Sequence, residues 1–575
     1  MTRTRAGLLL LLGTLLYAGS PFVSRELDLC DEGIVLTNAH LVAQGLWPNR
    51  DFWTYYPPGQ YVLLAGLFRW VGPSMAVGRL VFMTTLVGII LASFAVLSQW
   101  TRRRGLALAG AGVVLCWYGA LWPAPLAVHT AVLLVLLTLS CQLAAVARQR
   151  AWLMAVAGMT TAVTVFVRHD YGGELLLATV LLLAAGRALR RLAPGAVTLP
   201  LRAGRAYLAG GLLVAAPLAA WWLQGVSWRV LVNDLGVYVF QRHLGTLRVG
   251  PPAPWPPVSS LWTGAVSWPT WGLELYTRLA LWYLPWAALA GAAAWLVRQC
   301  RRGAWGRWEQ QGLGLLLVAL ALQPVGWLRS DWTHRIYVVA PPLLVLVGFF
   351  GAVLPRLRPT AARAARLAAL AVLALAPVPR LLHPPWRGPT HPMTLERARG
   401  IAIRDVAGAQ ALEAAVRAIR RATAPGEPIY AATRCQGRIF AAGEVGLYFL
   451  SDRPAGTRYA ESWMTLLHDP AVQQTIIRDL DTRRVTLLVF KAMTPAELYH
   501  INGLLTADQL AAEPVAPLLD DYVRRHFAPL ETIGPFELYR RIGAPRPAGS
   551  GAEPVREDQR ARRLSARRWH GTLKL

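Results

Sequence analysis

Long apolar runs, separated by short arginine-rich turns, constrain the fold of this chain more than any other feature. About 20 consecutive apolar residues are needed for a helix to cross the roughly 30 Å hydrocarbon layer of a membrane. Runs close to this length recur up to about residue 380, and the whole 575-residue chain is 55% hydrophobic with a mean hydropathy of +0.37. The pattern predicts a mainly α-helical bundle that crosses a membrane many times.

We predict eleven spans in this part of the chain. They cover residues 6–17, 75–100, 106–121, 130–147, 151–167, 174–185, 206–223, 276–297, 312–328, 336–354 and 367–378. Arginine clusters follow every second span, from the second to the tenth. Because cytoplasmic loops carry an excess of arginine and lysine, this alternation predicts a cytoplasmic N-terminus and an extracytoplasmic C-terminus in the cytoplasmic (inner) membrane. The first run has the charge pattern of a signal peptide, but no clear cleavage site follows it, so we interpret it as an uncleaved span.

The net charge of +28 comes almost wholly from arginine, since Lys491 and Lys574 are the only lysines. A strongly basic chain can indicate a nucleic-acid-binding protein. Here the arginines gather in turns between apolar runs and form no basic stripe on a polar fold. We therefore predict no nucleic-acid partner and expect contact with membrane lipids.

The five cysteines show neither CxxC nor Cys/His spacing, which argues against a zinc site. Cys30 and Cys435 would share the outer compartment, and the sequence leaves open whether they form a disulfide. We expect no organic cofactor, and the sequence leaves the use of a divalent metal open.

The composition changes after the last predicted span. We assign residues 1–382 to the membrane domain, 383–394 to a proline-rich linker, 395–544 to a small extracytoplasmic α/β domain and 545–575 to a disordered basic tail. Within the α/β domain the patterns predict helices over 395–421 and 469–480, and strands over 428–432, 485–490 and 536–539. No GxGxxG motif occurs there, so we predict no nucleotide site.

The loop over residues 24–61 is the strongest functional candidate. Its acids include the adjacent pair Asp31 and Glu32, in a chain with only 31 acidic residues. A charge that enters a bilayer costs roughly 3 kcal/mol, so such acids need a wet cavity or a cationic partner. Residues 33–46 have the pattern of a helix lying flat on the membrane surface, which would hold the pair at headgroup depth.

The same loop ends in an aromatic and proline-rich stretch, YYPPGQY. Two prolines stiffen the backbone before the next helix. Tyr55 and Tyr56 have two interpretations, namely stacking on a sugar or membership of the aromatic belt at the membrane interface.

An outer loop with an Asp-Glu pair, an amphipathic segment and an aromatic-Pro-Pro stretch before the next span resembles the first extracytoplasmic loop of C-type glycosyltransferases. The chain is similar in this respect to the dolichyl-phosphate-mannose protein mannosyltransferases and the bacterial lipid A aminoarabinose transferases. The resemblance covers the membrane region and, loosely, the C-terminal domain. It implies that Asp31 is catalytic, with Glu32 as its neighbour.

Two further outer loops combine arginine, histidine and aspartate. One contains Arg168, His169 and Asp170. The other contains Arg329, Asp331, His334 and Arg335. Outer arginines run against the positive-inside trend and need a partner, which a polyprenyl phosphate could supply because the guanidinium plane matches phosphate oxygens. The alternative is an ion pair within each loop.

These features lead to a hypothesis of transfer from a polyprenyl-phosphate sugar to an acceptor hydroxyl of a lipid, glycan or protein on the outer face. Asp31 would act as general base, and direct attack would invert the anomeric carbon. A transporter or flippase of lipid-linked sugars is the alternative, although the charges gather at span ends rather than at mid-span. A non-catalytic lipid-binding scaffold is a third possibility.

Overall fold

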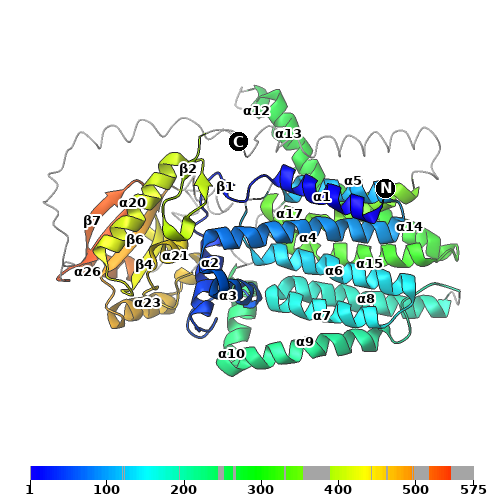
Figure 1. Ribbon diagram of the computed structural model, residues 1–575, viewed down its shortest axis with the longest axis horizontal. Helices are drawn as coiled ribbons and strands as arrows, with labels where there is room; N and C mark the ends of the chain where they lie inside the picture. Colours follow the sequence, from blue (N-terminus) through cyan, green and yellow to red (C-terminus); the bar gives the residue numbers. More distant parts are fainter. Residues whose placement is uncertain are drawn as a thin grey trace.

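The computed structural model describes residues 2–119, 121, 123–192, 195–243, 251–262, 267–328, 332–353, 389–441, 443–461, 464–494, 497 and 517–544. Figure 1 shows a bundle of long, nearly parallel helices with a smaller α/β part at one end, opposite the N-terminus. Helices α2 (Asp31–Ala43) and α3 (Gly59–Val71) lie between the two parts. The predicted span 367–378, the start of the linker and the tail lie outside the described residues.

Ten of the predicted spans fall on helices of the bundle. These helices are α1 (Arg3–Ala18), α4 (Met75–Thr101), α5 (Arg104–Tyr118), α6 (Ala127–Arg148), α7 (Trp152–Val167), α8 (His169–Leu192), α9 (Ala203–Gly225), α13–η2–α14 (Trp268–Arg301), α15 (Arg307–Ala321) with α16 (Gln323–Leu328), and α17 (Trp332–Val353). Five helical segments in the described residues are long and apolar enough to cross a membrane, namely Met75–Thr101, Ala127–Arg148, His169–Arg191, Ala203–Gly225 and Trp268–Arg301. The total of eleven spans stays a prediction.

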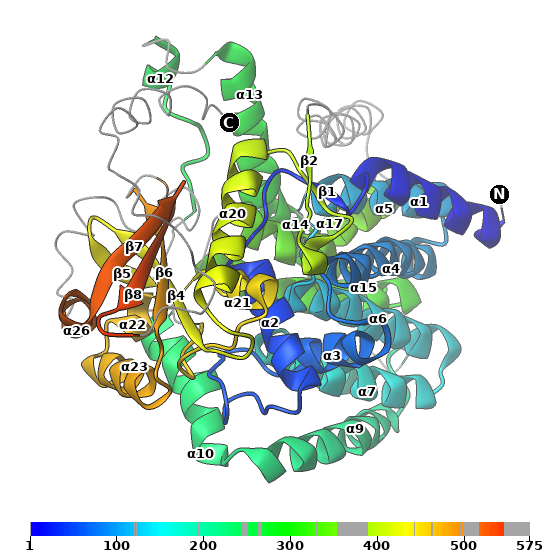
Figure 2. The same cartoon turned by 60° about the vertical axis from the view of Figure 1, so that its left-hand side comes forward.

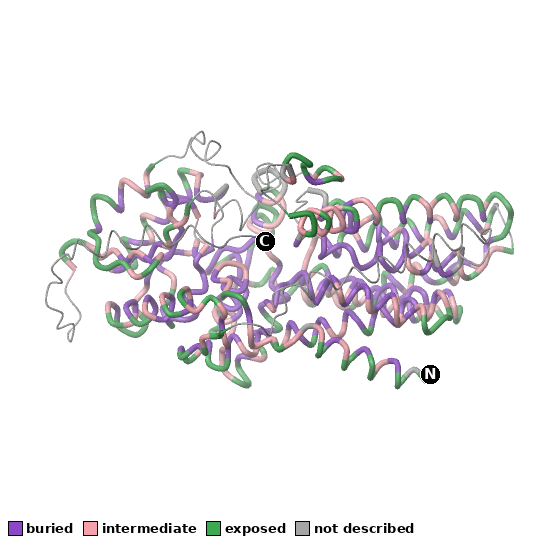
Figure 3. Tube along the Cα trace, turned by 90° about the horizontal axis from the view of Figure 1, so that it is seen from above, coloured by how far each residue is buried: buried purple, intermediate pink, exposed green. Residues whose placement is uncertain are grey.

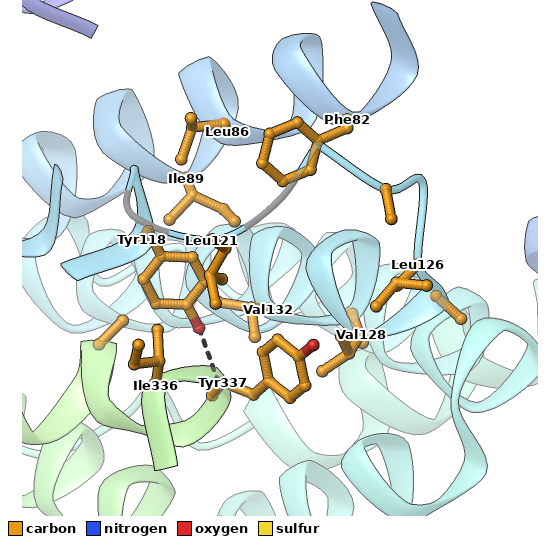
Figure 4. Packing of buried hydrophobic residues seen from close by; sticks show 14 of the residues in the cluster. Phe82, Leu86, Ile89, Tyr118, Leu121, Leu126, Val128, Val132, Ile336 and Tyr337 are labelled. Carbon is orange, nitrogen blue, oxygen red and sulfur yellow. Dashed lines mark hydrogen bonds between the residues drawn. The ribbon is translucent and has the colours of Figure 1, made fainter. Parts of the chain in front are cut away.

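Apolar side chains from neighbouring helices interlock inside the bundle. In Figure 4, Phe82 and Ile89 of α4 lie above Val132 of α6, and the Tyr118 hydroxyl donates a hydrogen bond to the Tyr337 carbonyl at 2.7 Å. This bond satisfies a polar group that no water would reach in the interior. It also ties α5 to the N-terminal end of α17.

The C-terminal part is a five-stranded mixed sheet in the order β5-β4-β6-β8-β7. Its strands are β4 (Ile429–Cys435), β5 (Arg438–Ala441), β6 (Leu487–Met493), β7 (Phe527–Ile533) and β8 (Phe536–Arg541). Strands β4 and β6 are parallel, and α20 (Val406–Ala422), α23 (Pro470–Thr482) and α26 (Leu518–His526) pack around the sheet. All three predicted strands and the helix predicted over 469–480 have counterparts here.

The helix predicted over 395–421 begins later than its periodicity indicated. Residues Glu396–Ala398 form a 3₁₀ turn, Ala402–Ile403 form strand β3, and α20 starts only after Asp405. The Asp405 carboxylate accepts a hydrogen bond from the Gly408 N–H at 3.0 Å and so caps the helix there.

The loop between α1 and α3 is joined to the C-terminal part by strand pairing and close helix packing. Strand β1 (Val23–Ser24) pairs in parallel with β3, which also pairs with β2 (His391–Pro392), so the end of the predicted linker is part of a small sheet. Gly33 of α2 lies so close to Gly446 at the start of α21 (Gly446–Ser451) that a Cβ would strike its backbone nitrogen. Figure 2 shows α2 between the sheet region and α3.

The first half of α2 is therefore covered by protein, whereas His40–Ala43 are only partly buried, and the prediction that the helix lies flat on the membrane surface stays a prediction. Residues Glu32 to Ala39 are buried, and the Thr37 hydroxyl donates a hydrogen bond to the Val445 carbonyl at 3.0 Å. Figure 3 shows buried backbone running from the bundle through this junction. The C-terminal part covers the polar side chains of Thr37 and Asn38 on this helix.

Candidate active site

Asp31 is the first residue of α2 and sits at the junction of the two parts. The Asp28 carboxylate accepts hydrogen bonds from the backbone N–H groups of Cys30 and Asp31, each at 2.9 Å. These bonds satisfy amides that the helix start leaves free and fix the position of Asp31. Burial raises the pKa of Asp28 well above its usual range, and the charges of Asp31 and Glu32 raise it further.

Glu32 is held in a different environment from its neighbour. Both of its carboxylate oxygens accept hydrogen bonds from Arg79 of α4, at 2.8 and 2.9 Å, and the two side chains are 2% and 1% exposed. Arg79 also donates to the Ser24 hydroxyl at 3.0 Å. Glu32 thus fastens α2 and the chain before it to the bundle, and its oxygens are already occupied.

Tyr56 connects Asp31 with the loop between α7 and α8. The Arg168 guanidinium lies over the Tyr56 ring, 5.1 Å from its centre, and the Tyr55 hydroxyl donates to the Tyr56 hydroxyl at 3.1 Å. Burial raises the pKa of Tyr56; the charge of Arg168 lowers it and the charge of Asp31 raises it. The structure therefore brings together four predicted site residues that come from two loops.

Arg168 is also paired within its own loop. It forms a bidentate pair with Asp170, with N···O distances of 2.9 and 2.5 Å. This is the ion pair that the sequence left as an alternative to a ligand role. The pair holds the guanidinium plane rigidly against Tyr56, since two parallel hydrogen bonds fix its orientation.

The long loop after α9 closes another side of the aromatic cluster. Its π-helix η1 (Val232–His243) places Tyr238 edge-on against Trp53, with ring centres 4.9 Å apart, and Asp234 accepts a hydrogen bond from Asn49 at 3.2 Å. His169, the first residue of α8, lies beside the backbone of Leu235 in η1.

Glu461 of the C-terminal part lies near Asn38 and Asp31, and the sequence did not indicate it as a site residue. It is 1% exposed and accepts a hydrogen bond from Asn38 of α2 at 3.3 Å. Burial raises the pKa of Glu461 to about 8, and the nearby charge of Asp31 adds to this rise. Glu461 follows α21 in a segment without clear periodicity, so no local signal marks it.

A second acid of the C-terminal part pairs with a lysine near the loop. Lys491 lies 3.8 Å from Glu444, and this carboxylate raises the pKa of the lysine, with Glu26 and Asp28 adding to the effect. Strand β6 thus presents a cation to the acidic loop.

The loop before α17 is only partly described. Arg329 and Asp331 lie outside the described residues. His334 lies 5.6 Å from the ring of Tyr337, and Arg335 is 1% exposed and donates to the Leu281 carbonyl and to Gln323, at 3.1 and 3.2 Å. The predicted role of these two residues next to Asp31 stays a prediction.

Within the described part of the chain, no three His, Cys, Asp or Glu side chains converge as metal ligands. Cys30 and Cys435 are both free thiols, so they do not form the disulfide that the sequence left open.

The helical bundle with an α/β part at one end resembles the fold of the C-type membrane glycosyltransferases. Two solved structures of ArnT from Cupriavidus metallidurans share this fold. One, bound to undecaprenyl phosphate, has a TM-score of 0.53 at 14% identity and covers 94% of this chain and 99% of ArnT. The other, in the apo state, has a TM-score of 0.53 at 16% identity and covers 93% and 98%. The predicted resemblance is thus confirmed at the level of the fold.

No protein-family model matches the chain, and no curated protein matches it in sequence.

Proposed function

We propose that this protein is a membrane glycosyltransferase that moves a sugar from a polyprenyl-phosphate donor to an acceptor hydroxyl on the outer face of the membrane. The fold shared with ArnT, whose structure holds undecaprenyl phosphate, supports this class of donor. The observation that carries the proposal is the position of Asp31. It starts a helix that is buried over Glu32–Ala39, and it lies near enough to Tyr56, which the Arg168 guanidinium covers, for its charge to raise the pKa of that tyrosine.

Asp31 is the general base in this proposal, and Glu32 is structural. Asp31 takes the proton from the acceptor hydroxyl while the hydroxyl oxygen attacks the anomeric carbon. The bond from that carbon to the phosphate oxygen breaks, and its electron pair leaves with the phosphate. With one carboxylate acting directly on the acceptor, the product has the inverted configuration.

Arginines stabilise the negative charge that develops on the departing phosphate. Arg168 is already oriented by Asp170 and lies on Tyr56 at the site. Arg335 is a second candidate, because it is buried and bonds only neutral oxygens among the described residues. Such a guanidinium favours an anion strongly when water is excluded. Tyr55 and Tyr56 offer faces on which a sugar ring can stack, and the C-terminal part closes the site from outside.

Asp31→Asn tests the proposal because it keeps the side-chain shape and removes the base. With radiolabelled undecaprenyl-phosphate pentoses and hexoses in liposomes, and envelope membranes as acceptor, we expect kcat to fall about 10²- to 10⁴-fold. Asp51→Asn is the matched control, since Asp51 lies in the same loop in a partly exposed pair with Arg50. Wild-type transfer by Asp31→Asn, at equal amounts of protein, would rule out this role.

A further inference from the structure

Glu461 is a buried carboxyl group of the C-terminal part that lies near enough to Asp31 for the charge of Asp31 to raise its pKa. Its segment is fixed to the first loop by backbone bonds, since the Trp53 N–H donates to the Arg458 carbonyl at 2.9 Å. The Arg458 guanidinium donates in turn to the Asn49 carbonyl at 3.1 Å. Glu461 is therefore held in register with the loop that carries Asp31 and the tyrosines.

One oxygen of Glu461 is left without a partner. Oε2 accepts from Asn38, whereas Oε1 is fully buried and has no hydrogen-bond partner among the described residues. A buried polar atom of this kind costs free energy unless another group satisfies it. An orphan oxygen beside the proposed base therefore points to a bond that forms with substrate.

The surroundings of Glu461 favour its neutral form. Asn38 and Thr54 face the carboxyl with neutral polar groups that lower its pKa. The titratable groups that face it are Asp31 and Cys30 at the start of α2, and Tyr55, Tyr56 and Tyr61 around the entrance of α3. No arginine or lysine pairs with it among the described residues. Burial and the charge of Asp31 raise the pKa of Glu461 to about 8, so the side chain is mainly protonated at neutral pH.

We propose that Glu461 is a positioning residue of the transfer site, and that its neutral carboxyl donates a hydrogen bond from Oε1 to a substrate oxygen beside Asp31. This inference rests on the proposed function. A neutral donor suits this place because a second carboxylate next to the base would repel it and also the phosphate of the donor. The substrate that fits has a hydroxyl or ether oxygen here, and not an ammonium group.

The variants Glu461→Gln and Glu461→Ala distinguish a neutral hydrogen-bond donor from a required negative charge and from a residue without a role in transfer. The amide of Gln donates a hydrogen bond and is never charged, so we expect kcat within about tenfold of wild type at neutral pH. In wild type kcat should fall as pH rises through about 8, because the donor proton is lost, and in Glu461→Gln this fall should be absent. Glu461→Ala should lower kcat roughly tenfold to a hundredfold.

The matched control is Glu413→Gln in α20 of the same part of the chain. Glu413 is also buried, but it bonds Thr394 and Arg417 away from the site, so this variant should keep the alkaline fall of kcat. Glu461→Gln as inactive as Glu461→Ala, with both folded, would overturn the inference because a charge would then be required. Wild-type kcat in Glu461→Ala would also overturn it.

An infrared measurement distinguishes this inference from the proposed function. At neutral pH the spectrum of wild type minus that of Glu461→Gln should contain the C=O band of one protonated carboxyl, and this difference band should be lost near pH 8. An ionised Glu461 at neutral pH in an active enzyme overturns the inference alone. A neutral Glu461 in a protein that transfers no sugar overturns the proposed function, and the substrate contact with it.

Discussion

The adjacent acids Asp31 and Glu32 should respond to amide substitution in opposite ways. Glu32→Gln leaves the Arg79 guanidinium buried at 1% exposure with its two charge-assisted hydrogen bonds at 2.8 and 2.9 Å weakened or lost. Breaking one side of a buried pair costs about 3–5 kcal/mol, because the remaining charge stays in a poorly solvated place. Proteins are stable by only about 5–15 kcal/mol, so this loss is large.

The assay is unfolding in detergent micelles, followed by circular dichroism, together with transfer per folded molecule. Glu32→Gln should unfold far more easily than wild type, whereas Asp31→Asn should keep wild-type stability and lose transfer. The double variant Glu32→Met/Arg79→Met should recover most of the stability, because a well-packed apolar pair can replace a buried ion pair. Wild-type stability of Glu32→Gln, or a double variant as unstable as the single one, would refute the reasoning.

Two further predictions concern the junction between the helical bundle and the C-terminal part. Gly33→Ala should weaken the packing of the C-terminal part against α2, since the added methyl group would overlap the Gly446 backbone. Limited proteolysis should therefore cleave this variant near residue 389 faster than the control Gly66→Ala, in which the added Cβ contacts nothing. Above about pH 4.5 the wild-type free energy of unfolding should decrease relative to that of Glu461→Gln until about pH 8. The folded protein keeps a proton on Glu461 in this window that the unfolded chain has released, so rising pH favours unfolding. Equal slopes for the two proteins would contradict the raised pKa.

The helices of the bundle follow from local properties of the chain. A long apolar run must form a helix in lipid, because only then are its backbone groups satisfied, and the segments over 75–100 and 130–147 accordingly fall on α4 and α6. The residue at which a helix begins is harder to predict. The periodicity after residue 395 continued past a 3₁₀ turn and a short strand, and only the side chain of Asp405 marks where α20 begins.

The residue types in the first loop were enough to select Asp31, Tyr55 and Tyr56 as candidates, and those of the loop after residue 167 to select Arg168, because acids, aromatics and arginines beside a membrane are costly unless they have partners. Only the tertiary fold decides which groups these residues contact. The carboxylates of Asp31 and Glu32 differ because Arg79, which lies 47 residues after Glu32 in the chain, forms its ion pair with Glu32. Glu461 and Asn38 are 423 residues apart in the chain, and no local pattern links them. Burial and charge act through space rather than along the chain, so only the folded arrangement decides which acid is a base, which is an anchor and which keeps its proton.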